Sequence, residues 1–399
     1  MDNAEALPTI RLKPKADARM IRHGHPWVYS DDLVLDRRTK ALPAGSLAVL
    51  EDAERAPLAL VAVTPDSRIA ARVVDRNVAA VVDGAWFVAR LRAALALRER
   101  LFDAPFYRLV HAEADGLPGV VIDRFGDALV VQPNAAWADL RFELLADALE
   151  EVTGCATVIR NGMGRARKFE GLPEVLEVAR GVAPEGPVPV PMNGATYMAD
   201  LMGGQKTGLF YDQRDNHAFT ASLAKGARVL DVFSHVGGFA LAALAGGAER
   251  ALAVDGAAPA LDLARAGAER TGVAERLEAR RGDAFEVMEA LAAEGARFDL
   301  VICDPPAFAP SKQALEKGLR AYERVARLAA SLVVPGGYLG LCSCSHAADL
   351  SRFRTACTRG IGRAGRAGAL VHTGFAGPDH PQHPHLAESG YLKALFYRL

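Results

Sequence analysis

The sequence predicts an α/β protein whose second half forms a parallel, doubly wound sheet. From about residue 195, apolar stretches of strand length alternate with stretches of helical periodicity, which is typical of parallel strands joined by crossover helices. These strands are almost continuously apolar, as expected where helices cover both faces of a sheet. Residues 1–82 predict a small β-rich module and residues 83–190 a small α+β module. We therefore expect three domains, at 1–82, 83–190 and 191–399.

Composition narrows the class of protein. The chain has 399 residues, of which 50% are hydrophobic and 24% charged, so it can bury sizeable cores. A formal net charge of -1 excludes a uniformly basic nucleic-acid coat but allows a local basic patch. Five cysteines without a CxxC pair indicate neither a disulfide scaffold nor a structural zinc site. With no signal-peptide core and no membrane-spanning run, we expect a cytoplasmic protein that binds no metal and no membrane.

The elements of the first two modules are predicted from the spacing of apolar residues and from turn residues. Alternating apolar residues between prolines and glycines predict strands, and apolar residues at helical spacing predict helices. A hairpin is expected where Phe125–Asp127 separates two apolar runs, and a proline- and glycine-rich stretch predicts a domain boundary. The expected strands are 46–52, 57–63, 68–74, 119–133 (the hairpin) and 157–161; the helices are 86–102 and 140–152; the boundary is 183–194.

The second half repeats a strand and a helix. The expected strands are 227–233, 248–255, 277–283, 298–304 and 338–345, and the helices are 239–247, 258–272, 284–294 and 314–334, the last one ended by Pro335–Gly337. Ligands of such sheets bind beyond the carboxyl ends of the strands. The residues that follow each strand are therefore the candidates for a site.

The first strand is followed by a glycine turn, DVFSHVGGF at 231–239. Gly237 and Gly238 would let a ligand approach the backbone at a helix N-terminus. The pattern is not GxGxxG, so it gives little support to a bound pyrophosphate. Asp255 ends the second strand, 24 residues after Asp231, where a carboxylate can accept hydrogen bonds from both hydroxyls of a ribose.

The next two strands also end in aspartates. Asp283 precedes Ala284–Phe285, a plausible edge for an adenine ring, and Asp304 begins the sequence DPPAF. A nucleoside site without a pyrophosphate site points to S-adenosylmethionine. A single aspartate after a strand is usually a helix cap, but three at successive strand ends favour a ligand site. Other nucleotide-binding α/β proteins remain an alternative.

The fifth strand, LCSCSH, carries two cysteines. Cys342 and Cys344 are two apart and would share one face of the strand, with Cys344 nearer the ligand edge. If the fourth and fifth strands are neighbours, Asp304 and Cys344 face one pocket. A thiolate that adds to carbon 6 of a pyrimidine makes carbon 5 nucleophilic towards a sulfonium methyl. Inert core cysteines are the alternative interpretation.

Several motifs together resemble a known family. DPPAF, PGGYLGLCSCSH, DVFSHVGGFALAAL and KTGLFYDQRDNH, with HPWVYS, RLVHAEADGLPGVVIDRFGD, DHP and GYLKALFYRL, are similar to the bacterial class I methyltransferases that make 5-methylcytosine in 23S ribosomal RNA. The resemblance covers essentially the whole chain. It implies an N-terminal PUA-like RNA-binding domain, a central α/β domain, a Rossmann-like methyltransferase domain, and 23S rRNA as the partner.

The resemblance also implies roles for single residues. Cys344 would be the nucleophile and Asp304 its catalytic partner. The residues of KTGLFYDQR alone predict a turn between strands, with Lys206 and Arg214 solvated, but the resemblance implies that this segment covers the cofactor. The residues expected to bind S-adenosylmethionine are Tyr211, Gln213, Arg214, Asp231, Phe233, Ser234, Gly237, Gly238, Asp255, Gly256, Asp283, Ala284 and Asp304.

This chain departs from the family pattern at three points. Many relatives have lysine where Ala307 stands, and many have an aromatic–threonine pair in place of His235–Val236. Two-cysteine relatives carry a cysteine just after the DPP proline, whereas Cys303 here precedes Asp304 and is expected to be buried. The group that assists product release therefore stays open.

Two other activities remain alternatives: guanine N-methylation, which needs no thiolate, and non-catalytic RNA binding during ribosome assembly. The sequence does not identify the modified nucleotide, the form of the rRNA that is recognised, or the oligomeric state, for which a homodimer is one alternative.

Three further features are ambiguous in the sequence. His380, His383 and His385 suggest a metal tract, but a loop near the active-site rim is favoured because no fourth ligand is evident. Trp27 either stacks on RNA or fills a core. A basic loop could contact phosphates or simply be solvated; its cations are Arg160, Arg165, Arg167 and Lys168.

Overall fold

The computed structural model describes residues 7–204 and 207–399. The chain forms two compact units. The first consists of Met1–Glu185, Leu201–Thr207 and Pro378–Ala387, and the second of Gly186–Asp200, Gly208–Gly377 and Glu388–Leu399. No helix in the described ranges is long and apolar enough to cross a membrane.

The N-terminal part of the first unit is a five-stranded sheet in the order β1-β3-β4-β5-β2. The three strands predicted from alternation are confirmed, and Ile10, Val28 and Val61 lie in their buried core. The elements are β1 (Thr9–Arg11), α1 (Ala18–His23), β2 (Trp27–Tyr29), α2 (Arg37–Lys40), β3 (Ser46–Glu51), β4 (Pro57–Val63) and β5 (Ile69–Asp75).

The rest of the first unit is built on a second five-stranded sheet, in the order β10-β9-β8-β7-β6. The predicted helices and hairpin are confirmed, and the stacked rings of Phe87 and Trp137 fill the core. The elements are α3 (Gly84–Leu101), β6 (Phe106–His111), η1 (Ala112–Asp115), β7 (Val120–Phe125), β8 (Ala128–Pro133), α4 (Ala136–Leu140), α5 (Phe142–Thr153), β9 (Thr157–Asn161), η2 (Arg165–Glu170) and β10 (Leu176–Arg180).

Buried hydrogen bonds tie the segment Pro378–Ala387 into this unit. The Arg98 guanidinium is fully buried and donates to both carboxylate oxygens of Asp115, at 2.6 and 2.8 Å. It also donates to the backbone oxygen of Asp379 at 2.9 Å, and the Asp379 side chain accepts from the backbone N–H of Arg108 at 3.0 Å. Each buried charge thus has a partner, which offsets the cost of removing it from water.

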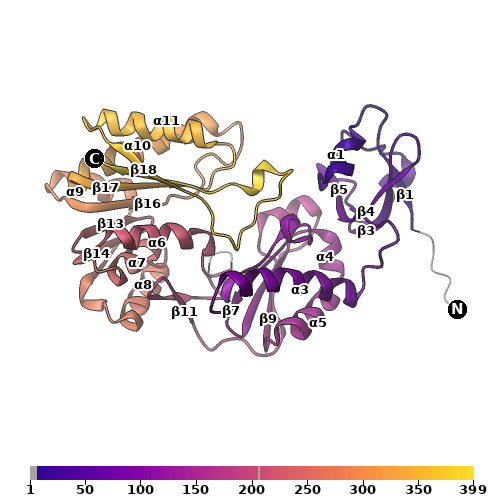
Figure 1. Ribbon diagram of the computed structural model, residues 1–399, viewed down its shortest axis with the longest axis horizontal. Helices are drawn as coiled ribbons and strands as arrows, with labels where there is room; N and C mark the ends of the chain where they lie inside the picture. The colour runs from indigo at the N-terminus through magenta and orange to yellow at the C-terminus, as the bar shows by residue number, and fades with distance from the viewer. Residues whose placement is uncertain (1–6, 205–206) are drawn as a thin grey trace. The chain divides into compact units, whose positions relative to one another are not determined.

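The second unit is a seven-stranded sheet in the order β15-β14-β13-β16-β17-β19-β18, preceded by a β11–β12 hairpin. Helices α10 and α11 cover one face of the sheet, and α6, α7 and α8 lie on the other (Figure 1). The elements are β11 (Val188–Met192), β12 (Ala195–Ala199), η3 (Tyr211–Gln213), α6 (Arg214–Leu223), β13 (Arg228–Val232), α7 (Gly238–Ala245), β14 (Arg250–Asp255), α8 (Ala258–Thr271), η4 (Ala274–Arg276), β15 (Leu277–Arg281), α9 (Ala284–Ala293), β16 (Phe298–Cys303), α10 (Leu315–Leu332), β17 (Val333–Ser343), α11 (Leu350–Arg363), β18 (Ala369–Gly374), η5 (Ala387–Ser389) and β19 (Lys393–Arg398).

The predicted α/β class is confirmed, with three local differences. Strands β18 and β19 add an antiparallel edge to the parallel sheet. Within the predicted boundary stretch, VPVPM forms β11, because Val190 and Met192 alternate with prolines and point into the core. Helix α10 ends at Leu332, as expected to within two residues, but the Pro335–Gly337 stretch lies inside β17 and not in a turn before it.

Candidate active site

The carboxyl ends of four parallel strands meet at one edge of the second unit. Strand β13 pairs with β14 and β16, and β16 pairs with β17, so that Cys303 is in register with both Val232 and Leu341. The predicted adjacency of the fourth and fifth strands is therefore confirmed. Asp304 and Cys344, which follow β16 and β17, leave the sheet from this same edge.

The turn after β13 is strained. Phe233 and His235 both adopt left-handed backbone conformations, with φ of 63° and 50°, and Gly237 has φ of 78°. A non-glycine residue in this region costs of order 1–3 kcal/mol, and such strain concentrates at functional sites. Gly238 is required for a different reason, since a Cβ there would lie 2.7 Å from Nε2 of His217.

Asp231 lies under this turn and is fully buried. Its Oδ2 accepts from the backbone N–H of Ala240 at 2.9 Å, while its Oδ1 has no hydrogen-bond partner within the described residues. Burial raises the pKa of Asp231 to about 7. Ser234 Oγ is also buried and, among the residues described, unpartnered. Buried polar atoms normally have hydrogen-bond partners, so this turn suits a ligand that carries hydrogen-bonding groups. The amino acid and ribose parts of S-adenosylmethionine carry such groups.

The other two strand-end aspartates bind backbone N–H groups. Asp255 accepts from His235 at 2.9 Å through one oxygen and from Ala257 at 2.8 Å through the other. Each of its oxygens keeps a second lone pair that a ribose hydroxyl can use. Asp283 is exposed and caps α9, accepting from Phe285 at 2.9 Å, which matches the helix-cap interpretation. The predicted positions Gly256 and Ala284 directly follow these two carboxylates.

Three half-buried phenylalanine rings gather beyond the strand ends. Phe233 lies 6.3 Å from both Phe285 and Phe308, measured between ring centroids, and the latter two are 6.4 Å apart. They come from the turn after β13, from α9 and from the loop after β16. The rings form an apolar wall of the kind that a flat heterocycle packs against.

The FYDQR segment differs from the turn that its residues alone predict. Tyr211–Gln213 forms a short 3-10 helix, and Arg214 begins α6, with its guanidinium 5.5 Å from the Tyr211 ring. Gln213 Nε2 donates to Asp304 Oδ2 at 2.8 Å, and Asn216 holds Gln213 Oε1 at 2.7 Å. Gln213, predicted to bind the cofactor, is thus brought to Asp304. Lys206 of the same motif lies outside the described residues.

Cys344 is the first residue after β17, so it lies just beyond the strand that carries Cys342. The strand ends at Ser343, and the chain turns there because Ser343 Oγ accepts from the backbone N–H of Ser345 at 3.2 Å. Cys344 is half-exposed, whereas Cys342 is buried and burial raises the pKa of its thiol. The buried position predicted for Cys303 is confirmed.

A network of hydroxyl groups joins the loop that carries Asp304 to the loop that carries Cys344. Ser345 Oγ accepts from the backbone N–H of Ala309 at 2.9 Å and lies 2.7 Å from the hydroxyl oxygen of Tyr322. Ser343 Oγ donates to the same Tyr322 oxygen at 2.9 Å. All three hydroxyl-bearing residues are buried. The network fixes the two loops with respect to each other.

Lys393 is a site residue that our sequence reasoning missed. Only 5% of the residue is exposed, and its Nζ donates to the backbone oxygens of Ser345 and Ala348, both at 2.7 Å. The sequence does contain one indication of its importance, since Lys393 is the single charged residue in the apolar run YLKALFY. Buried lysines are rare unless a partner or a function retains them.

The remaining sequence candidates lie in the first unit. In the basic loop, Arg160 and Arg167 both pair with Asp139 at 2.7 Å, so only Arg165 and Lys168 are exposed. Trp27 Nε1 donates to Glu113 at 2.7 Å.

The histidine tract is a loop, as expected, and His380 is buried beside Asp379, 2.9 Å away. Over the described residues, no group of three or more His, Cys, Asp or Glu side chains could hold a metal ion.

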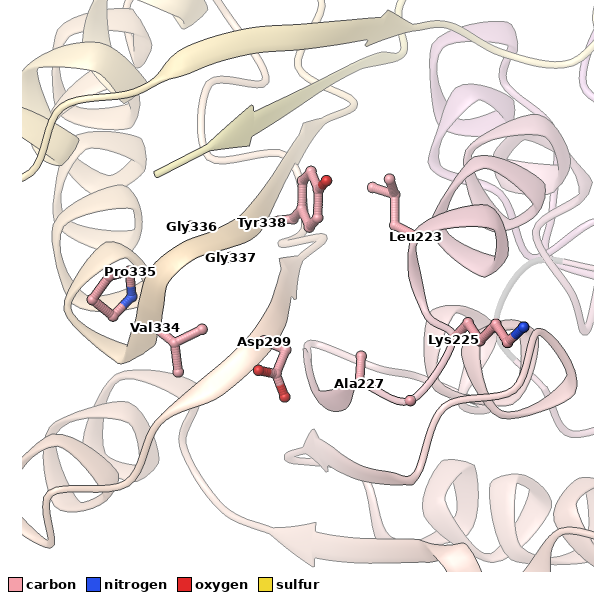
Figure 2. Close-up of a pocket in the computed structure, with 10 residues that line it drawn as sticks. Leu223, Lys225, Ala227, Asp299, Val334, Pro335, Gly336, Gly337 and Tyr338 are labelled. Carbon is pink, nitrogen blue, oxygen red and sulfur yellow. The ribbon is translucent and has the colours of Figure 1, made fainter.

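A surface hollow lies at the opposite edge of the sheet in the second unit. Figure 2 shows it between Lys225 and Leu223 on one side and Val334, Asp299 and Tyr338 on the other, near the amino ends of β13 and β16. None of the predicted site residues lines it. It is therefore not the nucleoside site that the strand ends predict.

Comparison with known proteins agrees with this geometry. Residues 182–398 match the family of S-adenosylmethionine-dependent methyltransferases, and residues 10–76 match the PUA-like domain family. Among curated proteins, ribosomal RNA large subunit methyltransferase I of Erwinia tasmaniensis is 36% identical over 397 residues, covering 98% of this chain and all of the relative. The protein of the same name from Yersinia pseudotuberculosis is 33% identical over 396 residues, with the same coverage of both chains.

Solved structures support the fold. A protein from Streptococcus mutans described as a SAM-dependent methyltransferase has a TM-score of 0.83 at 18% identity, over 98% of this chain and all of that one. Another, a methyltransferase complexed with SAH, has a TM-score of 0.84 at 18% identity, over 99% of this chain and all of that one. With the whole-length relatives and the matched methyltransferase domain, the chain belongs to the ribosomal RNA large subunit methyltransferase I family and is an S-adenosylmethionine-dependent methyltransferase.

Proposed function

We propose that this enzyme methylates carbon 5 of a cytosine in 23S ribosomal RNA, through a covalent bond between Cys344 and the base. The observation that carries the proposal is the pair of half-buried groups at one sheet edge: Asp304 after β16 and Cys344 after the neighbouring β17. The names of the whole-length relatives support a ribosomal RNA substrate.

The chemistry assigns a task to each group. Bound S-adenosylmethionine supplies an electrophilic methyl group. The Cys344 thiolate would add to carbon 6 of the cytosine, and the electron pair of the 5,6 double bond would become available at carbon 5. Carbon 5 would then form the new carbon–carbon bond as the bond between the methyl group and the sulfonium sulfur breaks, its electron pair staying on sulfur. Asp304, held by Gln213 at 2.8 Å, would accept a hydrogen bond from the exocyclic amine, and from ring nitrogen 3 once that nitrogen is protonated in the adduct. After transfer, a base removes the proton from carbon 5, the double bond re-forms, and the thiolate leaves.

The RNA would contact the PUA-like domain and the exposed part of the basic loop. In that loop, the buried side chains of Arg167 and Glu170 fix the backbone, while Phe169 is 75% exposed beside the exposed cations Arg165 and Lys168. An exposed aromatic ring that adjoins exposed cations suits an unpaired base and its phosphates. The division of the chain at 1–82, 83–190 and 191–399, the cytoplasmic location and the oligomeric state remain predictions.

The test uses 23S rRNA fragments that contain 5-fluorocytidine. Fluorine at carbon 5 prevents the final elimination, so the wild-type enzyme should become trapped on RNA in a complex that survives denaturing electrophoresis. Cys344→Ala should abolish the complex, whereas Cys342→Ala should retain it. Nucleoside mass spectrometry of ordinary rRNA gives the product. Methylated guanosine, or an adduct that persists in Cys344→Ala, would refute the proposal.

A further inference from the structure

A buried ammonium group, that of Lys393, lies under the turn that carries Cys344. Lys393 begins β19, which pairs with β17 in antiparallel register, so that Lys393 is opposite Ser343. This register brings the lysine next to the residue that precedes Cys344. Its Nζ then closes the turn from the other side, through the backbone oxygens of Ser345 and Ala348.

Two hydrogen bonds do not by themselves explain a lysine here. Burial of an ammonium costs free energy, and burial lowers the pKa of Lys393 to about 8, while the charge of Cys344 counteracts this shift. A neutral donor could satisfy the two carbonyl groups at a smaller desolvation cost. What a neutral donor cannot supply is positive charge at the turn that carries Cys344, where it would stabilise the thiolate.

We propose that Lys393 is a positioning residue that holds the Cys344 turn and favours the thiolate form of Cys344. The thiolate is the nucleophilic form of cysteine, and a neighbouring cation is an established means of populating it. The proposal concerns the nucleophile assigned above and so rests on the proposed function for its use in catalysis. The effect of Lys393 on the thiol can be measured without RNA or cofactor.

Other titratable groups come from the elements around this turn. Asp304 follows β16, and Asp349, which caps α11, interacts electrostatically with Lys393. Tyr322 of α10 interacts electrostatically with Cys344, and His346 and Tyr391 form a ring pair at 5.5 Å just beyond it.

The experiment measures the alkylation rate of Cys344 by iodoacetamide against pH, in the full chain, with the modified peptide quantified by mass spectrometry. Lys393→Gln retains a donor but loses the charge, and Lys393→Arg retains both. We expect the pH midpoint of alkylation to rise by about one unit in Lys393→Gln, a roughly tenfold slower reaction at pH 7. The midpoint of Lys393→Arg should stay near that of wild type.

A purely structural lysine would change the limiting rate at high pH, through altered access to the sulfur, but not the midpoint. Lys317→Met, which removes an exposed lysine of α10, is the matched control and should behave as wild type. An unchanged midpoint in Lys393→Gln, or an equal rise in Lys393→Arg, would overturn the proposal. The 5-fluorocytidine trap in the wild type separates the role of Cys344 in catalysis from the effect of Lys393 on its thiol. If no RNA complex is trapped but the alkylation midpoint still rises in Lys393→Gln, the role of Cys344 in catalysis is refuted and the effect of Lys393 stands.

Discussion

The buried carboxyl group of Asp231 should make the second unit less stable as pH rises. Its pKa is raised by burial from 3.8 to about 7, so in the unfolded chain the group loses its proton well before it does in the folded enzyme. Between these two values the unfolded state binds fewer protons, and stability therefore falls with rising pH. Since one pKa unit is about 1.4 kcal/mol, the full loss is about 4 kcal/mol, and about 3 kcal/mol of it falls between pH 4.5 and pH 8.

Asp231→Asn removes this titration and keeps an oxygen for the N–H of Ala240. We expect the free energy of unfolding of the variant, relative to wild type, to increase by about 3 kcal/mol from pH 4.5 to pH 8. Pulsed hydrogen exchange of β13 peptides across a guanidinium series measures this for the second unit alone. Ser234→Ala changes a buried group that does not titrate, and its difference from wild type should be the same at each pH. Parallel pH curves for wild type and Asp231→Asn would refute the reasoning.

Three further predictions concern other parts of the enzyme. Gln213→Ala removes the amide that orients the catalytic carboxylate, so kcat for methyl transfer should fall by roughly ten- to a hundredfold in steady-state assays. Arg98→Met leaves the buried Asp115 unpaired and should destabilise the first unit by about 3–5 kcal/mol, which exchange of α3 peptides measures, and the added change Asp115→Asn should recover much of the loss. Phe169→Ala should weaken binding of an rRNA fragment by about 1–3 kcal/mol in filter binding, whereas Val182→Ala, also exposed, should not.

The positions of the strand-end residues could be predicted because they depend on topology. Alternating strands and helices determine a parallel sheet, and a parallel sheet brings its carboxyl ends to one edge. That reasoning places Asp255, Asp304 and Cys344 together without knowledge of any side-chain contact. It also explains why the hollow at the amino ends could be dismissed as a nucleoside site.

The parts that could not be predicted depend on contacts between residues distant in sequence. The local sequence of KTGLFYDQR indicates a turn, but the hydrogen bond from Gln213 to Asp304, 91 residues away, gives the segment its place at the site. Cys344 leaves its strand because Ser343 caps the following turn, a contact that strand periodicity does not encode. Lys393 belongs to a late antiparallel strand, and its relation to Cys344 appears only when β19 pairs with β17.

The distribution of buried charge distinguishes structure from function in this chain. In the first unit, the buried guanidinium groups of Arg98 and Arg167 each meet a carboxylate at 2.6–2.7 Å, which is what stability alone requires. At the carboxyl edge of the second unit, Asp231 and Lys393 are buried without an opposite charge in hydrogen-bonding contact among the residues that the structure describes, and the adjoining turn holds two strained residues. Each of these features costs folding free energy. Packing alone gives no reason to keep such costly groups together. Their concentration at one sheet edge is explained if they serve the ligands and the nucleophile of the reaction.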